Sequence, residues 1–259
     1  MDLETALRAT RQWVPFAART IAYGTVSLSL GPLTRDRRAS LWAMREWCRA
    51  SARGLDLEVV ASGMENVPPP PFVYCSNHQS LLDVLVLGAV LPHDYKWAAK
   101  RSLLRIPFLG WHLQLAGHVP VDRSGGARGA AEAISRFQTV LEAGKPLLVF
   151  PEGTRSEDGL LRAFKNGGFY AAVRAGVPVV PIALEGTHRL MKKHAPVTGD
   201  GRMQVRAGLP LYARTEGREG PRVNDLRERT HASVAEMLRA MGGHVEGEGS
   251  PGAAPGASA

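Results

Sequence analysis

Three apolar runs limit what this chain can fold into: FVYC at 72–75, PLLVF at 146–150 and VPVVPIAL at 177–184. A strand with apolar or β-forming residues at successive positions, rather than at alternate ones, is buried on both faces, as in a parallel sheet covered by helices. Helical patterns follow at about 80–91, 130–143 and 223–241, and a shorter one ends at Gly176. This alternation predicts an α/β fold with a mostly parallel central sheet flanked by helices.

Weaker strand patterns at 55–63, 95–100, 118–121 and 203–211 extend the expected sheet. A chain of 259 residues, 44% of them apolar, can bury one substantial core. We therefore expect an N-terminal helical pair at 1–55, one α/β domain at 56–242, and a disordered tail at 243–259, where no core-forming pattern occurs.

The N-terminal segment is basic and amphipathic. Residues 1–53 hold nine arginines against four acidic residues, interleaved with tryptophans and aliphatic residues. This pattern is typical of a segment that lies on an anionic membrane surface. Pro15 and Arg19 interrupt the apolar run, so a membrane-spanning helix is not expected. The alternative is a helical pair packed on the core with solvated charges. No nucleic-acid-binding motif occurs, and we expect no nucleic-acid partner.

Polar residues follow three of the expected strands. Because the carboxyl ends of parallel strands meet at one edge of a sheet, we expect these residues to form a pocket there, where cations bind an anionic group such as phosphate. Taken singly, each arginine is more simply a surface ion pair. The candidates are Asn77, His78 and Asp83; Asp122 and Arg123; Glu152, Gly153, Thr154 and Arg155; with Lys100 and Lys165.

His78 and Asp83 are the candidate catalytic pair. On one helix they would point about 140° apart, so they can meet only if His78 precedes the helix. Ser80 fits an N-cap, with Asp83 at the third helical position of a capping box. Asp83 then either only caps the helix, or it also accepts a hydrogen bond from one imidazole nitrogen and leaves the other as a base.

Several catalytic motifs are missing from the sequence. It contains no GxSxG, no GxxxxGK[ST], no GxGxxG after a strand, and no third ligand near His78 that would make a zinc site. Cys75 could act as a nucleophile, but a cysteine that ends an apolar strand is usually a buried hydrophobe. A base without a nucleophile indicates that the substrate brings one, as when an alcohol attacks an activated thioester.

The motifs NHQSLLD at 77–83, VDR at 121–123, FPEGTRS at 150–156 and VPIAL at 180–184 resemble, in this order, the four motifs of the glycerophospholipid acyltransferases. The resemblance covers about 63–211 and is closest to the bacterial 1-acyl-sn-glycerol-3-phosphate acyltransferases. AFKNGGF at 163–169 resembles a basic stretch of that family. Asn166 stands where a second lysine is common, which leaves Lys165 as the expected contact.

The resemblance implies transfer of a fatty acyl group from acyl-CoA or acyl carrier protein to the sn-2 hydroxyl of 1-acylglycerol 3-phosphate (lysophosphatidate), which makes phosphatidic acid. His78 would be the general base and Asp83 would fix its tautomer. Lys100 would stabilise the oxyanion, and no metal or cofactor beyond the acyl donor is implied. The other implied substrate-binding residues are Asn77, Arg123, Glu152, Gly153, Thr154, Arg155 and Lys165, with Val180 and Pro181 near the acyl chain.

The resemblance also implies that the N-terminal helical pair docks on the cytoplasmic face of the inner membrane, where the protein would be peripheral or monotopic. Three alternatives stay open. The acceptor could be another lysolipid or glycerol 3-phosphate, the chain could be a non-catalytic lipid-binding protein of the same fold, or water could replace the alcohol, as in a thioesterase.

Overall fold

The computed structural model describes residues 3–122, 125–191 and 201–247. They form a seven-stranded sheet in the order β1-β7-β6-β2-β5-β3-β4. Neighbouring strands are parallel except β6 and β7, which are antiparallel, so the expected mostly parallel sheet is confirmed. The strands are β1 (Leu57–Ser62), β2 (Val73–Ser76), β3 (Lys96–Lys100), β4 (Val119–Val121), β5 (Leu147–Val149), β6 (Val179–Glu185) and β7 (Gly201–Ala207).

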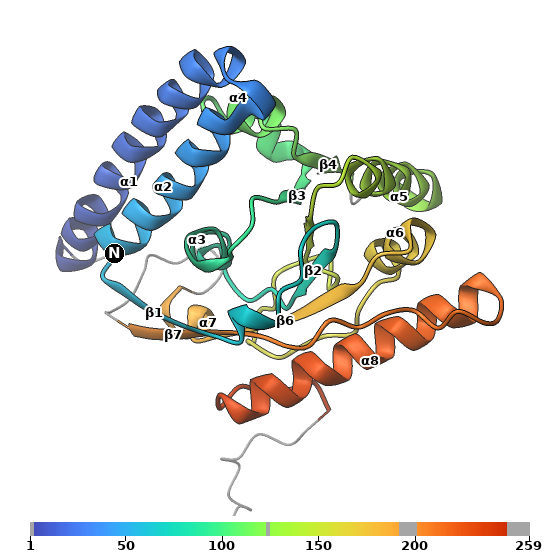
Figure 1. Ribbon diagram of the computed structural model, residues 1–259. Helices are drawn as coiled ribbons and strands as arrows, with labels where there is room; N and C mark the ends of the chain where they lie inside the picture. The colour runs from blue at the N-terminus through green and yellow to red at the C-terminus, as the bar shows by residue number, and fades with distance from the viewer. Residues whose placement is uncertain (1–2, 123–124, 192–200, 248–259) are drawn as a thin grey trace, which may run out of the picture.

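Helices cover both faces of the sheet, as the continuous apolar strands require (Figure 1). Side chains alternate along a strand, so Val73 and Cys75 of β2 face one apolar core and Tyr74 faces the other. The helices are α1 (Leu3–Leu30), α2 (Arg38–Gly54), α3 (Leu82–Val90), α4 (Leu109–Leu115), α5 (Gly126–Glu142), α6 (Gly167–Ala175), α7 (Thr187–Leu190) and α8 (Glu219–Ala240), with 3-10 turns at Gly31–Leu33, Arg35–Arg37, Met64–Asn66 and Arg101–Arg105. One apolar core lies beneath α5, α6 and α8, and a second lies beneath α2 and α3. The centre of the sheet is buried between these two cores.

The expected helices are present, with shifted ends. Helix α6 ends at Gly176, whose φ of 66° is the left-handed conformation that favours glycine after a helix. Helix α3 begins at Leu82 rather than Ser80, while α5 and α8 begin four residues earlier than the patterns indicated. Those first turns hold glycine and charged residues, which an apolar pattern does not detect.

The residues that follow α8 differ from the prediction of a disordered tail from residue 243. Val245 is only 6% exposed, and it forms a parallel bridge with Leu161. The prediction is therefore wrong for residues 243–247, because a single apolar side chain among glycines and charges gives no periodic signal. Residues 248–259 lie outside the described part of the chain.

Helices α1 and α2 form a pair that lies beside the sheet domain (Figure 1). Several of its arginines hold it to the body of the protein: Arg37 donates to the carbonyl of Leu115, Arg45 pairs with Asp94 at 3.2 Å, and Arg49 donates to the carbonyl of Ala89. Part of the positive charge is therefore structural. No described helix is both long enough and apolar enough to cross a membrane.

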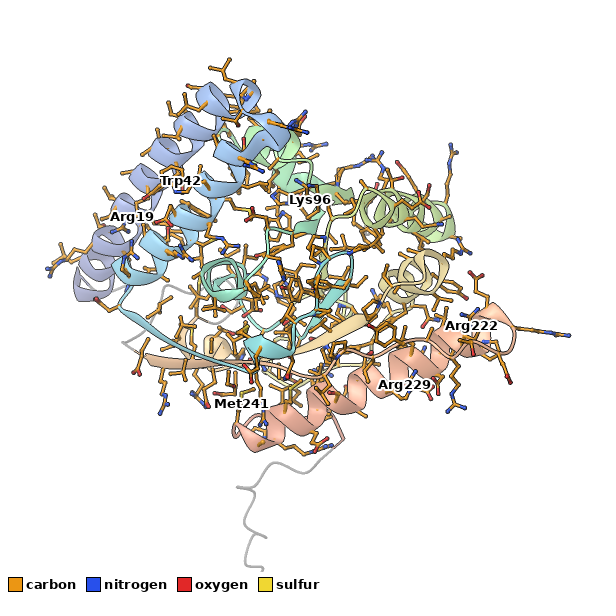
Figure 2. All side chains as sticks on the ribbon, viewed as in Figure 1. Arg19, Trp42, Lys96, Arg222, Arg229 and Met241 are labelled. Carbon is orange, nitrogen blue, oxygen red and sulfur yellow. The ribbon has the colours of Figure 1, made fainter. Side chains whose placement is uncertain are left out.

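Large apolar side chains remain exposed on the pair and on the turn that joins its helices. Leu33 is 80% exposed and Trp42 is 54% exposed. Figure 2 shows Trp42 and Arg19 on this pair, whereas Arg222 and Arg229 project from α8 at the other side of the molecule. Arg229 pairs there with Asp225 at 2.8 Å. The two outer layers thus differ: the α1–α2 pair exposes apolar groups, and α8 exposes paired charges.

Candidate active site

The His78–Asp83 pair lies where β2 ends and α3 begins. His78 precedes the helix, so its Nδ1 reaches Asp83 Oδ2 at 2.7 Å, as the geometric argument required. The backbone N–H groups of Gln79 and Ser80 donate to the same Oδ2, at 2.7 and 2.9 Å. Asp83 thus caps the first turn and contacts the imidazole at the same time.

The hydrogen bonds fix the tautomer of His78. Because the ionised Asp83 can only accept, Nδ1 must carry the proton and Nε2 must present a lone pair. Nε2 bonds to none of the described residues. The ring stacks on Phe150 with centroids 4.0 Å apart, and the side chain is 10% exposed. The arrangement can take a proton from a ligand that reaches Nε2.

Thr187 is a member of this group that the sequence analysis missed. Its Oγ1 donates to Asp83 Oδ1 at 2.6 Å, and the residue is fully buried at the start of α7. Asp83 therefore receives four hydrogen bonds. The available signal was position: Thr187 follows the third buried strand, β6, after Gly186, whose φ is 96°. That is the same edge of the sheet where the other polar clusters lie.

Asn77 is bound within the protein. Its Nδ2 donates to the carbonyl of Leu184, and its Oδ1 accepts from the N–H of Leu184, both at 2.8 Å. The residue is fully buried. It ties the loop after β2 to β6, so the structure supports a positioning role in place of the substrate contact that we expected.

Glu152 also connects segments of the protein. Its Oε1 accepts from the backbone N–H of His78 at 2.7 Å, and its Oε2 accepts from that of Arg162 at 3.1 Å. Burial raises the pKa of Glu152 from 4.5 to about 7, because a charged carboxylate loses its hydration, while the two N–H groups act in the opposite direction. Glu152 thus positions the backbone of His78. Both of its oxygens are engaged by backbone N–H groups, so its geometry supports this positioning role rather than the substrate contact that we expected.

A pocket opens beside Phe150 at the carboxyl ends of β3, β4 and β5. Gly153 and Lys165 line it, together with Gly167 and Gly168 at the first turn of α6. Gly153 has a φ of 78°, and a Cβ there would lie 2.6 Å from Lys165 Nζ. Glycine suits both this left-handed backbone conformation and the close approach of the lysine.

The remaining expected site residues are distributed as follows. Lys100 ends β3 and Thr154 follows Gly153, both exposed, and Arg155 is half-buried. Arg123 lies outside the described residues, and Asp122 before it lines the pocket. Val180 and Pro181 are buried in β6 opposite Tyr74 and Cys75, and their assignment to the acyl chain stays a prediction.

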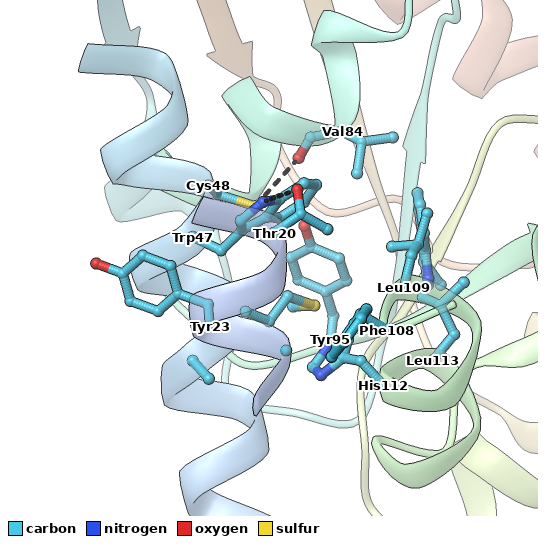
Figure 3. A pocket seen from close by; sticks show the side chains of 14 residues that line it. Thr20, Tyr23, Trp47, Cys48, Val84, Tyr95, Phe108, Leu109, His112 and Leu113 are labelled. Atoms are coloured by element: carbon cyan, nitrogen blue, oxygen red, sulfur yellow. Dashed lines mark hydrogen bonds between the residues drawn. The ribbon is translucent and has the colours of Figure 1, made fainter. Parts of the chain in front are cut away.

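A second pocket, on the other side of the sheet, is apolar (Figure 3). It lies between the α1–α2 pair and the body of the protein, with Tyr23, Trp47 and Phe108 in its walls. Trp47 Nε1 donates to Thr20 Oγ1 at 3.0 Å, which joins α1 to α2 beside it. Sequence reasoning missed this pocket because residues from α1, α2, α3, β3 and α4 form it together.

Other reactive chemistry has little support here. Burial raises the pKa of the Cys75 thiol well above its ordinary value, so it is not poised as a thiolate nucleophile. In the described ranges, no group of three or more His, Cys, Asp or Glu residues is placed to hold a metal ion. The site offers a histidine held by a buried carboxylate, together with exposed cations.

The chain matches known proteins along most of its length. A profile of the Acyltransferase family matches residues 58–185. The chain is 32% identical over 245 residues to the 1-acyl-sn-glycerol-3-phosphate acyltransferase of Pseudomonas aeruginosa, covering 92% of this chain and 93% of that relative. It is 39% identical over 179 residues to a chloroplastic 1-acyl-sn-glycerol-3-phosphate acyltransferase of Brassica napus, covering 68% of this chain but only 49% of that longer relative.

A solved structure agrees with these sequence matches. The crystal structure of the 1-acyl-sn-glycerophosphate (LPA) acyltransferase PlsC from Thermotoga maritima matches with a TM-score of 0.75 and 27% identity, over 91% of this chain and 96% of that chain. The likeness therefore includes the N-terminal helices as well as the sheet. The chain belongs to the glycerophospholipid acyltransferase family, as its motifs indicated, and it is an O-acyltransferase.

Proposed function

We propose that this protein transfers a fatty acyl group from a thioester donor to the sn-2 hydroxyl of lysophosphatidate, producing phosphatidic acid. The observation that carries the proposal is the His78–Asp83 pair, whose imidazole stacks on Phe150, a residue that also lines the pocket with Lys165. The family relatives support the acceptor, since their names describe action on 1-acyl-sn-glycerol 3-phosphate.

The reaction follows from the state of His78. Nε2 takes the proton of the acceptor hydroxyl as its oxygen attacks the thioester carbonyl, and the imidazolium that forms is stabilised by Asp83. The tetrahedral intermediate then breaks its carbon–sulfur bond, and His78 returns the proton to the leaving thiolate. No acyl-enzyme forms, and the histidine ends neutral. The assignment of Lys100 to the oxyanion stays a prediction.

The pocket beside Phe150 is suited to the phosphate of the acceptor. Lys165 supplies a positive charge, and the first turn of α6 supplies backbone N–H groups without bulky side chains at Gly167 and Gly168. Thr154 and Arg155 follow Gly153 in the chain, and we keep both as candidate ligands.

The apolar pocket under the α1–α2 pair is suited to an acyl chain. Each buried CH₂ group is worth about 0.8 kcal/mol, so a long chain needs an apolar environment at every stage of transfer. The exposed Leu33 and Trp42 on the same pair fit contact with a lipid surface, and so do Ile106 and Trp111 near α4. We infer that the protein works at a membrane with anionic lipids. Its place on the cytoplasmic face of the inner membrane stays a prediction, as does the choice between acyl-CoA and acyl carrier protein.

The test is acyl transfer by the purified protein from palmitoyl-CoA and from palmitoyl carrier protein. Lysophosphatidate should give product, whereas lysophosphatidylcholine, glycerol 3-phosphate and water should not. A product from another acceptor, or only free fatty acid, would replace the proposed acceptor. In parallel, flotation with phosphatidylglycerol vesicles should lose binding in a Leu33→Ser/Trp42→Ser variant. A Leu209→Ser/Tyr212→Ser variant, which changes equally exposed residues outside the pair, is the matched control.

A further inference from the structure

Residues 243–247, which we call the C-terminal strap, cross the segment that follows the β5 loop. The N–H of Leu161 donates to the carbonyl of His244, and the N–H of Glu246 donates to the carbonyl of Leu161, both at 3.1 Å. Val245, between them, is buried in the core beneath α8 together with Leu161. The strap therefore holds Leu161 by two backbone hydrogen bonds and one apolar anchor.

Arg162, the next residue, is held on several sides. Its guanidinium pairs with Asp158 and with Glu246 of the strap. Its N–H donates to Glu152 Oε2 at 3.1 Å. The position of the strap and the position of the Glu152 carboxylate are thus linked through one residue.

Glu152 passes this constraint to the catalytic histidine. Its Oε1 accepts from the N–H of His78 at 2.7 Å, and the N–H of Ser156 donates to the carbonyl of His78 at 2.9 Å. Both backbone polar groups of His78 are therefore held by the loop that follows β5. A continuous series of contacts runs from Val245 and Glu246 to the base.

We propose that the C-terminal strap is a positioning element for His78, with Val245 and Glu246 as its positioning residues. The proposal rests on the proposed function, because it assigns the strap a role in placing the base of that reaction. The physical reason is that a displacement of about 1 Å at a reacting group can cost up to 10²-fold in rate. The strap acts by fixing the Arg162–Glu152 connection and makes no contact with substrate.

The experiment compares two truncations of the full chain. A chain that ends at Gly242 lacks the strap, and a chain that ends at Gly247 keeps it and is the matched control. For the first, we expect kcat for palmitoyl transfer to lysophosphatidate to fall roughly ten- to hundredfold, with KM changed less than about twofold. Hydrogen exchange should rise in peptides covering 76–81 and 150–162. The second should match the full chain in both measurements.

Point variants keep the test decisive if the shorter truncation does not fold. Val245→Ser and Glu246→Gln should each show part of the loss in kcat and the same local rise in hydrogen exchange. Val245→Ile keeps an apolar side chain and should match the full chain in both measurements. An unchanged kcat without the strap would overturn the proposal, and so would a rise in exchange spread evenly over the chain. A full-length protein that acylates none of the acceptors would overturn the proposed function instead, while the exchange data would still show whether the strap holds the His78 loop.

Discussion

A buried carboxylate holds each of the loops after β2 and β5: Asp83, in the first turn of α3, for the first loop and Glu152 for the second. The two carboxylates differ in where their hydrogen-bond donors lie along the chain. Asp83 receives three of its four donors from His78, Gln79 and Ser80, within five positions along the chain. Glu152 receives its two donors from His78 and Arg162, one of them 74 positions away. The first loop therefore organises the base locally, and the second connects the base to the rest of the domain. Four predictions test this division, from the largest expected effect to the smallest.

Removing the base should have the largest effect. His78→Ala should lower kcat by about 10²- to 10⁴-fold, the usual contribution of a general base, while the free energy of unfolding changes little. Steady-state transfer assays and thermal unfolding measure the two quantities. A variant that keeps full activity would show that the locally organised loop is only a helix cap.

The buried Glu152 of the second loop should make the free energy of unfolding depend on pH. Between pH 4.5 and about 7, folded Glu152 keeps a proton that the unfolded chain releases, so the free energy of unfolding should fall as pH rises through this window. The fall should be on the order of 3 kcal/mol. In Glu152→Gln this pH slope should disappear.

Urea unfolding at several pH values measures that slope. Glu152→Gln should also have a lower free energy of unfolding at every pH, because an amide has one oxygen and loses one of the two accepted hydrogen bonds. The test is therefore the change of this free energy with pH and not its absolute value. Glu142→Gln, an exposed change on α5, is the control that keeps the slope. Equal slopes in wild type and Glu152→Gln would contradict the raised pKa.

The pocket beside Phe150, at the loop after β5, should affect the KM for the acceptor. Lys165→Met removes the charge but keeps the length of the side chain, and we expect the KM for lysophosphatidate to rise about tenfold with kcat little changed. Lys145→Met is the matched control, because Lys145 lies at the opposite end of β5 and is also exposed. A rise in the KM for the acyl donor alone would reassign the pocket.

The smallest effect should come from Thr187, the one hydrogen-bond donor to Asp83 that lies far from it in the sequence. Thr187→Val removes the hydrogen bond to Asp83 Oδ1 at nearly constant volume. Losing one such bond costs about 1 kcal/mol, so we expect roughly a fivefold loss of kcat. A loss as large as that of His78→Ala would mean that the first loop depends on tertiary contacts as strongly as the second.

The sequence predicted features that depend on neighbouring residues better than features that depend on contacts between distant segments. The parallel sheet was predictable because FVYC, PLLVF and VPVVPIAL are apolar at successive positions, which indicates burial on both faces. The contact between His78 and Asp83 was one of two alternatives that the sequence left open, because a capping box places Asp83 at the first turn and allows His78 to precede the helix. The burial of Val180 and Pro181 in the sheet was not part of the prediction, because a motif identifies residues and does not reveal which of them the sheet buries.

The amino-acid sequence by itself determined the fold class, the family, and His78 and Asp83 as a candidate pair, because each depends on residues close together in the chain or on strongly patterned segments. Only the tertiary structure decided that Thr187 completes Asp83, that Asn77 and Glu152 position the loop, and that Val245 and Glu246 reach the same network. These contacts join residues separated by tens of positions. Their partners are selected by packing of the whole sheet, and local preference along the chain carries no signal for them.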